Sequence, residues 1–347
     1  MTEVDPRVMD MPRRDLWAAR IPGQVFVVEQ HRKVIRSGPG VVFSALIPDF
    51  DHFKGSEGGR TLPFLHPDCT PNLAPGLTTA LTGLFDAKVA PEEVLAYVAG
   101  VVAHPAFTKT FADELTTPGI RIPITTDAEL WTKAVGLGRQ MLWLHTYGQC
   151  FTGEGRPADG VRLPAGDPQR LLCQKPVTAL PEALFYVEDR QTIVMGDGEF
   201  GPVPRQVWDY AVGGRNVIKS WFDYRKKEPG GRRSSPLDDV NATAWDPDWT
   251  GEFLDLLSVL TRLVDLEPRQ AETLAFILTG GVVTLDDLAA TGVRWPQGTA
   301  DRKPRHSLDS VADGGVTPCC RPAAPSAQRA GARRDGPGSS AIPLWSW

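Results

Sequence analysis

The chain has 347 residues, of which 41% are apolar, 8% aromatic and 23% charged, a composition typical of a soluble protein with one large domain or two smaller ones. Its 34 glycines and 31 prolines interrupt helices too often for a coiled coil or a helical bundle, so a loop-rich α+β protein is expected. The net charge of −5 gives no global indication of a nucleic-acid or membrane partner.

The compartment is indicated by two absences in the sequence. Residues 1–6 lack the basic and apolar regions of a secretory signal, and no apolar run reaches the roughly 18 residues that span a bilayer. The five cysteines include no CxxC pair, which argues against both a disulfide framework and a structural zinc site. We therefore expect a cytoplasmic protein with reduced thiols and no membrane partner.

The first half of the chain changes from strand patterns to helix patterns. Apolar, β-branched runs at 25–29 and 41–46 predict two short strands joined by a turn. Pro91, followed by two glutamates, predicts a helix that ends near His104. Residues 126–129 form a capping-box pattern and predict a second long helix that runs towards His145.

The second half begins after a segment rich in glycine and proline. Residues 152–183 have nine Gly or Pro in 32 positions, which predicts a linker or a long loop. The elements expected beyond it are a hairpin at 184–187 and 192–195, a short helix at 204–210, an amphipathic segment at 216–224, and two helices that begin at 246–247 and at 268.

These patterns together predict an α+β fold with short N-terminal strands, a helical middle and a second α+β half with C-terminal helices. The expected divisions are an N-terminal half at 1–151, the linker or loop at 152–183, a basic and aromatic half at 184–310, and a disordered tail at 311–347.

The charge is unevenly distributed along the chain. Residues 205–235 contain eight Lys or Arg and three acids, a local charge of +5. The same stretch contains five aromatic residues, namely Trp208, Tyr210, Trp221, Phe222 and Tyr224. Cations neutralise phosphates and aromatic faces stack on bases, so this mixture is typical of a nucleic-acid groove. The alternative is that the aromatic residues are core and the cations form a solvated face.

Other patterns in the sequence are less specific indications of a functional site. The cluster Asp49, Asp51, His52, His66, Asp68 and Cys69 has the side chains of a metal site, although Asp in such places is also typical of turns. Residues 196–201 match GxGxxG, but acids fill the variable positions and a tight hairpin turn is favoured. His31, His104 and His145 are isolated and are interpreted as core or helix-end residues.

Several blocks, in one order, resemble a known family. They begin with Leu46-Ile47-Pro48-Asp49 and His52-Phe53, continue through 97–105, 111–123 and 137–145, and end with 207–214, 219–222, 224–226 and 235–239. Between about Pro12 and Leu308 the chain is similar to the C-terminal target-recognition, or specificity, domain of Type ISP single-polypeptide restriction-modification enzymes. In that family the domain follows an N6-adenine methyltransferase.

The resemblance implies a domain that closes over duplex DNA and reads an asymmetric target, while the methyltransferase flips an adenine. In the full-length family, S-adenosylmethionine, ATP and Mg²⁺ serve a methyltransferase, a motor and a nuclease, and those parts are missing from this sequence. We therefore expect no cofactor and no catalytic activity in this chain alone, with duplex DNA and a methyltransferase as its partners. Residues 1–10 are expected to be the edge of a larger protein.

The leading hypothesis is a non-catalytic DNA-recognition domain in which Gly213-Gly214 forms a tight turn and cations bind phosphates. The candidate DNA-binding residues are Arg215, Lys219, Trp221, Tyr224, Arg225, Lys226, Lys227, Arg232 and Arg233. No residue is assigned to a particular base. Two alternatives stay open, a scaffold that docks on a separately encoded methyltransferase and a metal-dependent hydrolase built on Asp49, His52 and His66.

Overall fold

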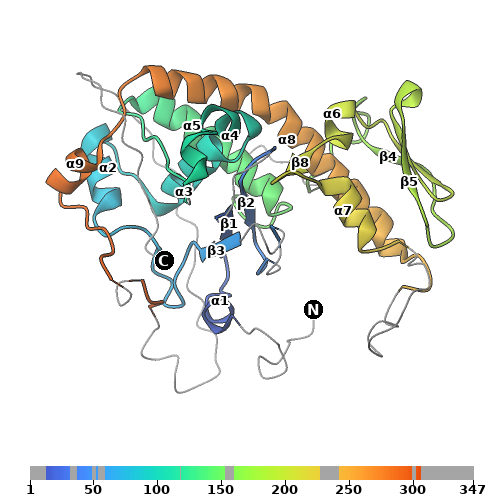
Figure 1. Cartoon of the computed structure of the whole chain (residues 1–347), viewed down its shortest axis with the longest axis horizontal. Helices are drawn as coiled ribbons and strands as arrows, with labels where there is room; N and C mark the ends of the chain where they lie inside the picture. Colours follow the sequence, from blue (N-terminus) through green and yellow to red (C-terminus); the bar gives the residue numbers. More distant parts are fainter. Residues whose placement is uncertain are drawn as a thin grey trace. The chain divides into compact units, whose positions relative to one another are not determined.

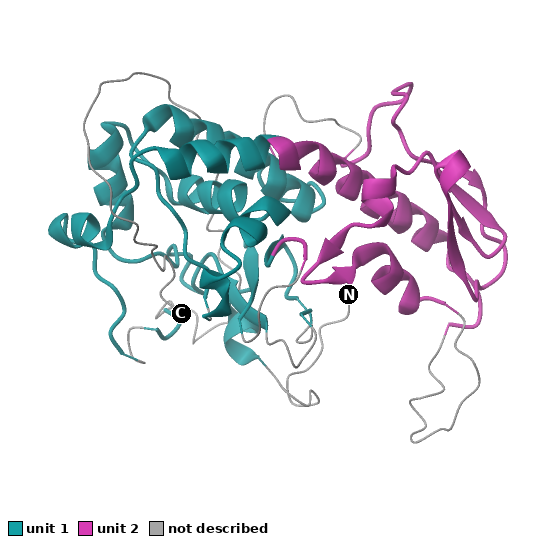
Figure 2. Ribbon diagram, turned by 45° about the horizontal axis from the view of Figure 1, so that its top comes forward, with its two compact units in different colours: residues 1–35, 40–151, 269–347 teal, residues 36–39, 152–268 magenta. Residues whose placement is uncertain are grey.

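The computed structural model describes residues 13–31, 37–48, 52–53, 59–117, 119–152, 160–226, 242–298 and 302–305. The chain forms two compact units (Figure 2). Unit 1 comprises residues 1–35, 40–151 and 269–347, and unit 2 comprises residues 36–39 and 152–268. Within the described ranges, no helix is both long and apolar enough to cross a membrane. The segment 311–347, expected to be disordered, lies outside these ranges.

Unit 1 combines a small antiparallel sheet, with strand order β2-β1-β3, and a set of helices (Figure 1). Its elements are α1 (Arg14–Ala18), β1 (Phe26–Gln30), β2 (Val41–Ser44), β3 (Gly59–Pro63), α2 (Leu77–Phe85), α3 (Pro91–Val102), α4 (Pro105–Thr110), the 3-10 turn Glu114–Thr116, α5 (Ala128–His145) and α9 (Leu285–Ala290). The expected strands at 25–29 and 41–46 and the two expected long helices are confirmed. The central strand β1 is buried along its whole length.

The starts of α3 and α5 follow from their first residues. Pro91 occupies the first turn of α3, where its missing N–H costs no helical hydrogen bond, and the Ala90 N–H donates to the Glu93 carboxylate at 3.0 Å. In α5 the capping residue is Asp127, whose carboxylate accepts from the N–H groups of Glu129 and Leu130. The helix predicted from the pattern at 126–129 is therefore present, but Asp127 caps it in place of the predicted box between Thr126 and Glu129.

Helices α3 and α5 pack against each other at unusually close range (Figure 1). A Cβ atom on Gly138 would lie 1.6 Å from the Ala96 carbonyl oxygen, and one on Gly100 would lie 2.3 Å from the Ala134 carbonyl oxygen. Only glycine fits at these two points, since a methyl group would overlap the backbone of the facing helix. The two glycines therefore set the distance between the helices.

Unit 2 contains a four-stranded antiparallel sheet, with strand order β4-β7-β6-β5, and several helices. Its elements are β4 (Leu172–Lys175), β5 (Leu184–Val187), the 3-10 turn Glu188–Arg190, β6 (Thr192–Met195), β7 (Gly198–Gly201), α6 (Arg205–Trp208), β8 (Ala211–Val212), β9 (Arg215–Asn216), α7 (Val217–Asp223) and the first part of α8 (Pro247–Thr279). The expected hairpin, short helix and amphipathic helix are confirmed. The GxGxxG match is a hairpin turn, with Gly196 at φ 59° between β6 and β7.

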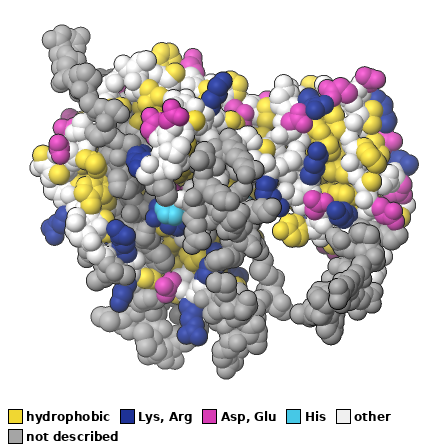
Figure 3. Space-filling model, in the orientation of Figure 1, with side chains coloured by type: hydrophobic (Ala, Val, Ile, Leu, Met, Phe, Trp, Pro, Cys, Tyr) yellow, Lys and Arg dark blue, Asp and Glu magenta, His cyan; other side chains and the backbone are white. Residues whose placement is uncertain are grey.

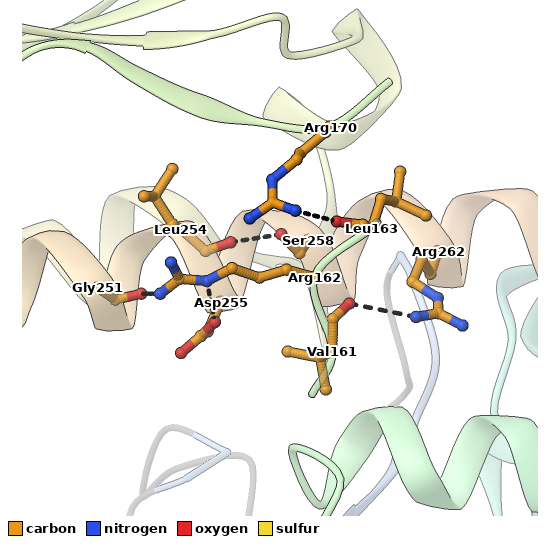
Figure 4. A network of polar contacts seen from close by, with 9 residues as sticks. All are labelled: Val161, Arg162, Leu163, Arg170, Gly251, Leu254, Asp255, Ser258 and Arg262. Atoms are coloured by element: carbon orange, nitrogen blue, oxygen red, sulfur yellow. Dashed lines mark hydrogen bonds and ion pairs between the residues drawn. The ribbon is translucent and has the colours of Figure 1, made fainter. Parts of the chain in front are cut away.

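Arginine side chains fasten part of the expected loop to α8 (Figure 4). The Arg162 guanidinium donates to Asp255 at 2.5 Å and to the Gly251 carbonyl at 2.9 Å, while Arg262 donates to the Val161 carbonyl at 3.3 Å. Further along the chain, β4 pairs with β7. The described residues 160–183 therefore contain a packed segment and a strand, which the glycine and proline content concealed.

One prediction about the helices is wrong. The sequence indicated separate helices from 246–247 and from 268, but α8 is a single helix with Pro268 inside it. Proline removes one backbone donor and disfavours the helix, yet apolar residues recur at helical spacing on both sides of it. The buried apolar residues of α8 are Phe253, Leu256, Leu257, Val259, Leu260, Leu263, Leu266, Leu274 and Ile277. Their burial outweighs the proline defect.

Replacing Gly138 with alanine tests the close contact between α3 and α5. We expect the free energy of unfolding to fall by about 1–3 kcal/mol, since the helices must separate to admit the methyl group. Gly136 provides a control on the same helix, because a Cβ there meets nothing within 4 Å. Gly136→Ala should raise stability by about 0.5–1 kcal/mol. Urea denaturation measures both, and equal effects would contradict the contact.

Candidate nucleic-acid interface

The candidate interface begins at the β8–β9 hairpin in unit 2. Val212 pairs with Arg215, and the two residues between them, Gly213 and Gly214, have φ values of 56° and 81°. Positive φ at both central positions of a two-residue loop defines a type I′ turn, which glycine adopts without strain. The predicted tight turn is confirmed, and it places Arg215 at the start of β9.

The hairpin is packed against another segment of unit 2. The Gly214 N–H donates to the Ser37 carbonyl at 2.8 Å, and the Gly213 N–H donates to the Pro39 carbonyl at 3.3 Å. A Cβ on Gly38 would lie 1.8 Å from the Ala211 carbonyl oxygen, so the two backbones are in direct contact. The backbone that approaches the glycine turn closely is therefore that of residues 37–39 of the same protein.

Helix α7 follows the hairpin directly and is held by its capping residue. The Asn216 side chain accepts from the Lys219 N–H at 2.8 Å and donates to the Trp208 carbonyl at 2.6 Å. Ile218 and Phe222, which are four residues apart, are buried on the inner face of the helix. The opposite face of α7 therefore projects Lys219 and the residues near Tyr224 into solvent.

Three of the predicted DNA-binding residues are exposed. Arg215 and Lys219 are exposed and have no ion-pair partner among the residues that the structure describes. The Lys219 ammonium lies 5.3 Å from the centre of the Trp208 ring. Tyr224, at the end of α7, is 81% exposed, which is unusual for an aromatic side chain. We call these three exposed residues, Arg215, Lys219 and Tyr224, the accessible edge.

Other cations of the basic stretch are already paired with acids. Arg205 forms ion pairs with Glu188 at 2.6 Å and Asp209 at 2.5 Å, and Lys226 pairs with Asp223 at 2.9 Å. Arg225 pairs with Glu252 at 2.9 Å. In the view of Figure 3, basic and acidic side chains are interspersed over the part of the surface that belongs to unit 2. The local charge of +5 therefore overstates the free positive charge of the folded surface.

The predicted aromatic residues divide between core and surface. Trp208, Tyr210 and Phe222 are buried, in agreement with the alternative that the aromatic residues of this stretch belong to the core. Trp221 is partly exposed, and its ring lies 4.8 Å from the Phe253 ring and 4.1 Å from the Arg225 guanidinium. Lys227, Arg232 and Arg233 lie outside the described residues. Tyr224 is thus the most accessible of the five aromatic side chains.

Sequence reasoning missed residues at the start of α8 that contact this region. Trp245 and Trp249 lie near Trp221 and Arg225, and Glu252 supplies the carboxylate that pairs with Arg225. The two tryptophans flank the helix start that the sequence predicted at 246–247, with Trp245 just before the helix and Trp249 in its first turn, and this was a usable signal. Their separation from residues 205–235 in the sequence hid the connection.

The residues of the metal-site alternative have other contacts. His66 is buried, and its Nδ1 accepts from the Arg305 N–H at 3.3 Å. The Asp68 carboxylate accepts from the Thr70 N–H at 2.9 Å and from its hydroxyl at 2.6 Å, which is the turn chemistry weighed for it. Among the described residues, no group of three or more His, Cys, Asp or Glu is placed to hold a metal ion. Asp49 and Asp51 lie outside those residues.

Two of the isolated histidines lie at helix ends, His104 buried and His145 half-buried by its accessible surface. His104 precedes α4 and His145 ends α5, where its Nδ1 accepts from the Phe43 N–H at 3.1 Å. Burial lowers the pKa of each to about 4, so both rings are neutral at physiological pH. The interpretation of these two residues as core or helix-end histidines is confirmed.

A half-buried acid lies near Tyr210, the residue that precedes the β8–β9 hairpin. Glu267, on α8, interacts electrostatically with the buried phenol of Tyr210, the residue that precedes β8. Desolvation raises the pKa of Glu267 from its ordinary value of 4.5 to about 7. Burial also raises the pKa of Tyr210 well above its ordinary value. The folded state therefore favours a protonated Glu267 near neutral pH.

Comparisons with known proteins place the chain beside DNA restriction enzymes. The family model for the Type ISP C-terminal specificity domain matches residues 1–256. Similar solved structures include a cryo-electron microscopy structure of the DrdV–DNA complex, with 15% identity, coverage of 73% of this chain and 24% of that chain, and a TM-score of 0.48.

Two further structures are similar. They are a nuclease-deletion mutant of the Type ISP restriction-modification enzyme LlaGI with a DNA substrate mimic (16% identity, 75% of this chain and 21% of that chain, TM-score 0.46) and the ATP-dependent Type ISP enzyme LlaBIII bound to DNA (14%, 75% and 16%, TM-score 0.46). The chain spans less than a quarter of the length of all three. No curated protein matches it.

The raised pKa of Glu267 predicts a pH-dependent stability. Below about pH 4.5 the carboxyl is protonated in both folded and unfolded chains, and its contribution to stability is fully present. That contribution is lost as the pH rises through about 7, since only the unfolded chain ionises freely. Glu267→Gln should remove this decline, which urea denaturation across the pH range measures. Parallel curves for the two proteins would refute the assignment.

Proposed function

We propose a DNA-recognition function, from the premise that this chain belongs to the family of Type ISP C-terminal specificity domains. In this proposal the chain binds duplex DNA and positions it for an adenine methyltransferase. The observation that carries the proposal is the accessible edge, where Arg215 and Lys219 are exposed and lack ion-pair partners within the described part of the chain. Such cations are free to replace the counterions of a phosphate backbone.

Each residue of the accessible edge has a role that its chemistry allows. Arg215, at the end of the glycine turn, and Lys219, on α7, bind phosphates of the duplex. Tyr224 offers an exposed hydroxyl that can donate to a phosphate of the same duplex. Lys226 stays a proposed contact that must leave Asp223 to act, and Lys227, Arg232 and Arg233 stay proposed phosphate contacts on their sequence position alone.

In this proposal a separate partner, and not this chain, carries the methyltransferase activity and binds its cofactor. The sequence lacks the Asn-Pro-Pro-Tyr and Asp-Pro-Pro-Tyr tetrapeptides that hold a target amino group in amino-methyltransferases. Its GxGxxG match is a hairpin turn with acids in the variable positions, a poor cradle for a phosphate. In this proposal we therefore assign S-adenosylmethionine, ATP and Mg²⁺ to a separate catalytic partner.

Salt titration of duplex binding tests the proposal. The affinity of the chain for a labelled mixed-sequence duplex should fall steeply between about 50 and 200 mM salt. Lys219→Met and Arg215→Met should each reduce the slope of log affinity against log salt by about 0.9, because each removes one phosphate contact. Fluorescence anisotropy measures the binding.

Arg205→Met is the matched control for this titration. Arg205 is also an exposed arginine of the basic stretch, but two acids already neutralise it. We expect its replacement to leave the slope unchanged. Binding that does not respond to salt would refute the proposed function and would favour the docking scaffold.

A further inference from the structure

Arg225 has surroundings that differ from those of Arg215 and Lys219. Its guanidinium carbon lies 4.1 Å from the centre of the Trp221 ring and 5.8 Å from that of Trp249. One terminal nitrogen pairs with Glu252 at 2.9 Å, and the other donates to the Trp221 carbonyl at 3.2 Å. The side chain is only 24% exposed. The guanidinium is therefore held on several sides by its own protein.

The tryptophans around Arg225 contact one another. The Trp221 ring lies 6.3 Å from that of Trp245, which in turn lies 5.3 Å from that of Trp249. We call Trp221, Arg225, Trp245, Trp249 and Glu252 the tryptophan clamp. It joins α7 to the start of α8 through residues that are more than twenty positions apart in the sequence, and all of it lies within unit 2.

The chemistry of the clamp argues against a phosphate contact. Glu252 already neutralises the charge of Arg225, and a phosphate would have to displace that carboxylate. The Nε atom is buried, with no hydrogen-bond partner in the described part of the chain, so it is not offered to a phosphate in solvent. Stacking on an indole is a strong role for arginine, because its cation is planar and weakly hydrated.

We propose that Arg225 is a positioning residue that fixes α7 to α8 and thereby orients Arg215, Lys219 and Tyr224 for DNA, without itself touching the nucleic acid. The inference rests on the proposed function and revises the role expected for Arg225 from the sequence. Lys219 lies in α7 and Tyr224 directly follows it, close in sequence to the clamp residues, while Arg215 directly precedes Asn216, the residue that caps the helix. A shift of α7 would therefore displace all three residues of the accessible edge. Trp221 likewise serves the clamp rather than stacking on a base.

Charge-preserving and charge-removing variants separate the two roles of an arginine. At a phosphate contact, lysine replaces arginine as a point charge, whereas it cannot reproduce a planar stack. We expect Arg225→Lys and Arg225→Met to weaken duplex binding alike, by about tenfold, because preorganisation is lost in both. Both should keep the wild-type salt slope. At Lys219, by contrast, Lys219→Arg should bind as the wild type does, and Lys219→Met should lower the salt slope by about 0.9.

Circular dichroism of the tryptophans and the variant Trp249→Leu provide two further tests of the clamp. The packed tryptophans should give a near-ultraviolet circular dichroism signal that Arg225→Lys and Arg225→Met reduce, while the far-ultraviolet spectrum shows that the variants are folded. Trp249→Leu removes one wall of the clamp and no charge. It should reproduce the loss of affinity with an unchanged salt slope.

Two results would overturn the inference. One is an Arg225→Met slope that falls by about 0.9 while Arg225→Lys binds as the wild type does, which is the behaviour of a phosphate contact. The other is an unchanged near-ultraviolet spectrum in both Arg225 variants. Failure of the proposed function looks different, since the wild-type chain itself would then show no salt-dependent binding, while the spectrum would still report whether Arg225 holds the tryptophans.

Discussion

The close contact of α3 and α5 is the constraint on which unit 1 depends. With backbones touching at Gly100 and Gly138, neither helix can rotate or slide without a steric clash. Other contacts use this fixed pair as their support. The Tyr97 ring stacks on Trp131 at 4.3 Å while its hydroxyl bridges the Pro123 carbonyl and the Thr125 N–H, and the Gln270 amide donates to the Gly100 carbonyl at 3.1 Å. The phenol hydroxyl of Tyr97 and the amide nitrogen of Gln270 thus find hydrogen-bond partners next to the fixed helix pair.

Unit 2 is organised around the first part of α8. Phe253 of this helix contacts Phe200 of the sheet and Trp221 of α7, while Arg162 fastens the segment before β4 to the same helix. The folding of unit 2 also determines which cations of the basic stretch remain free. Three of the five cations of the basic stretch that the structure describes, Arg205, Arg225 and Lys226, are paired with acids of the protein. A count of charges along the sequence therefore overstates the free positive charge that a ligand would meet.

Much of the architecture was accessible from local patterns. The N-terminal strands, the helices after Pro91 and Asp127, the central hairpin of unit 2 and the glycine turn all follow from signals within a few residues of each other. The errors concern features that depend on tertiary packing, which local sequence patterns do not contain. Pro268 reads as a helix start, but the buried side chains on both sides of it keep α8 continuous. The role of Arg225 depends on Trp249 and Glu252, which are distant in sequence and reach it only through the fold.

The continuity of α8 sets a rule for dissecting this protein. The helix contributes residues up to Pro268 to one unit and residues from Arg269 onward to the other. The family match ends at residue 256, inside the helix, so a shortened chain that stops there would lose Leu257, Leu260 and Leu263 from one core and Gln270 from the other. Neither unit can be excised along the family boundary with its hydrophobic interior complete. A fragment for expression is better ended after Arg305, because Val283, Leu288 and Val293, which follow the helix, are also buried.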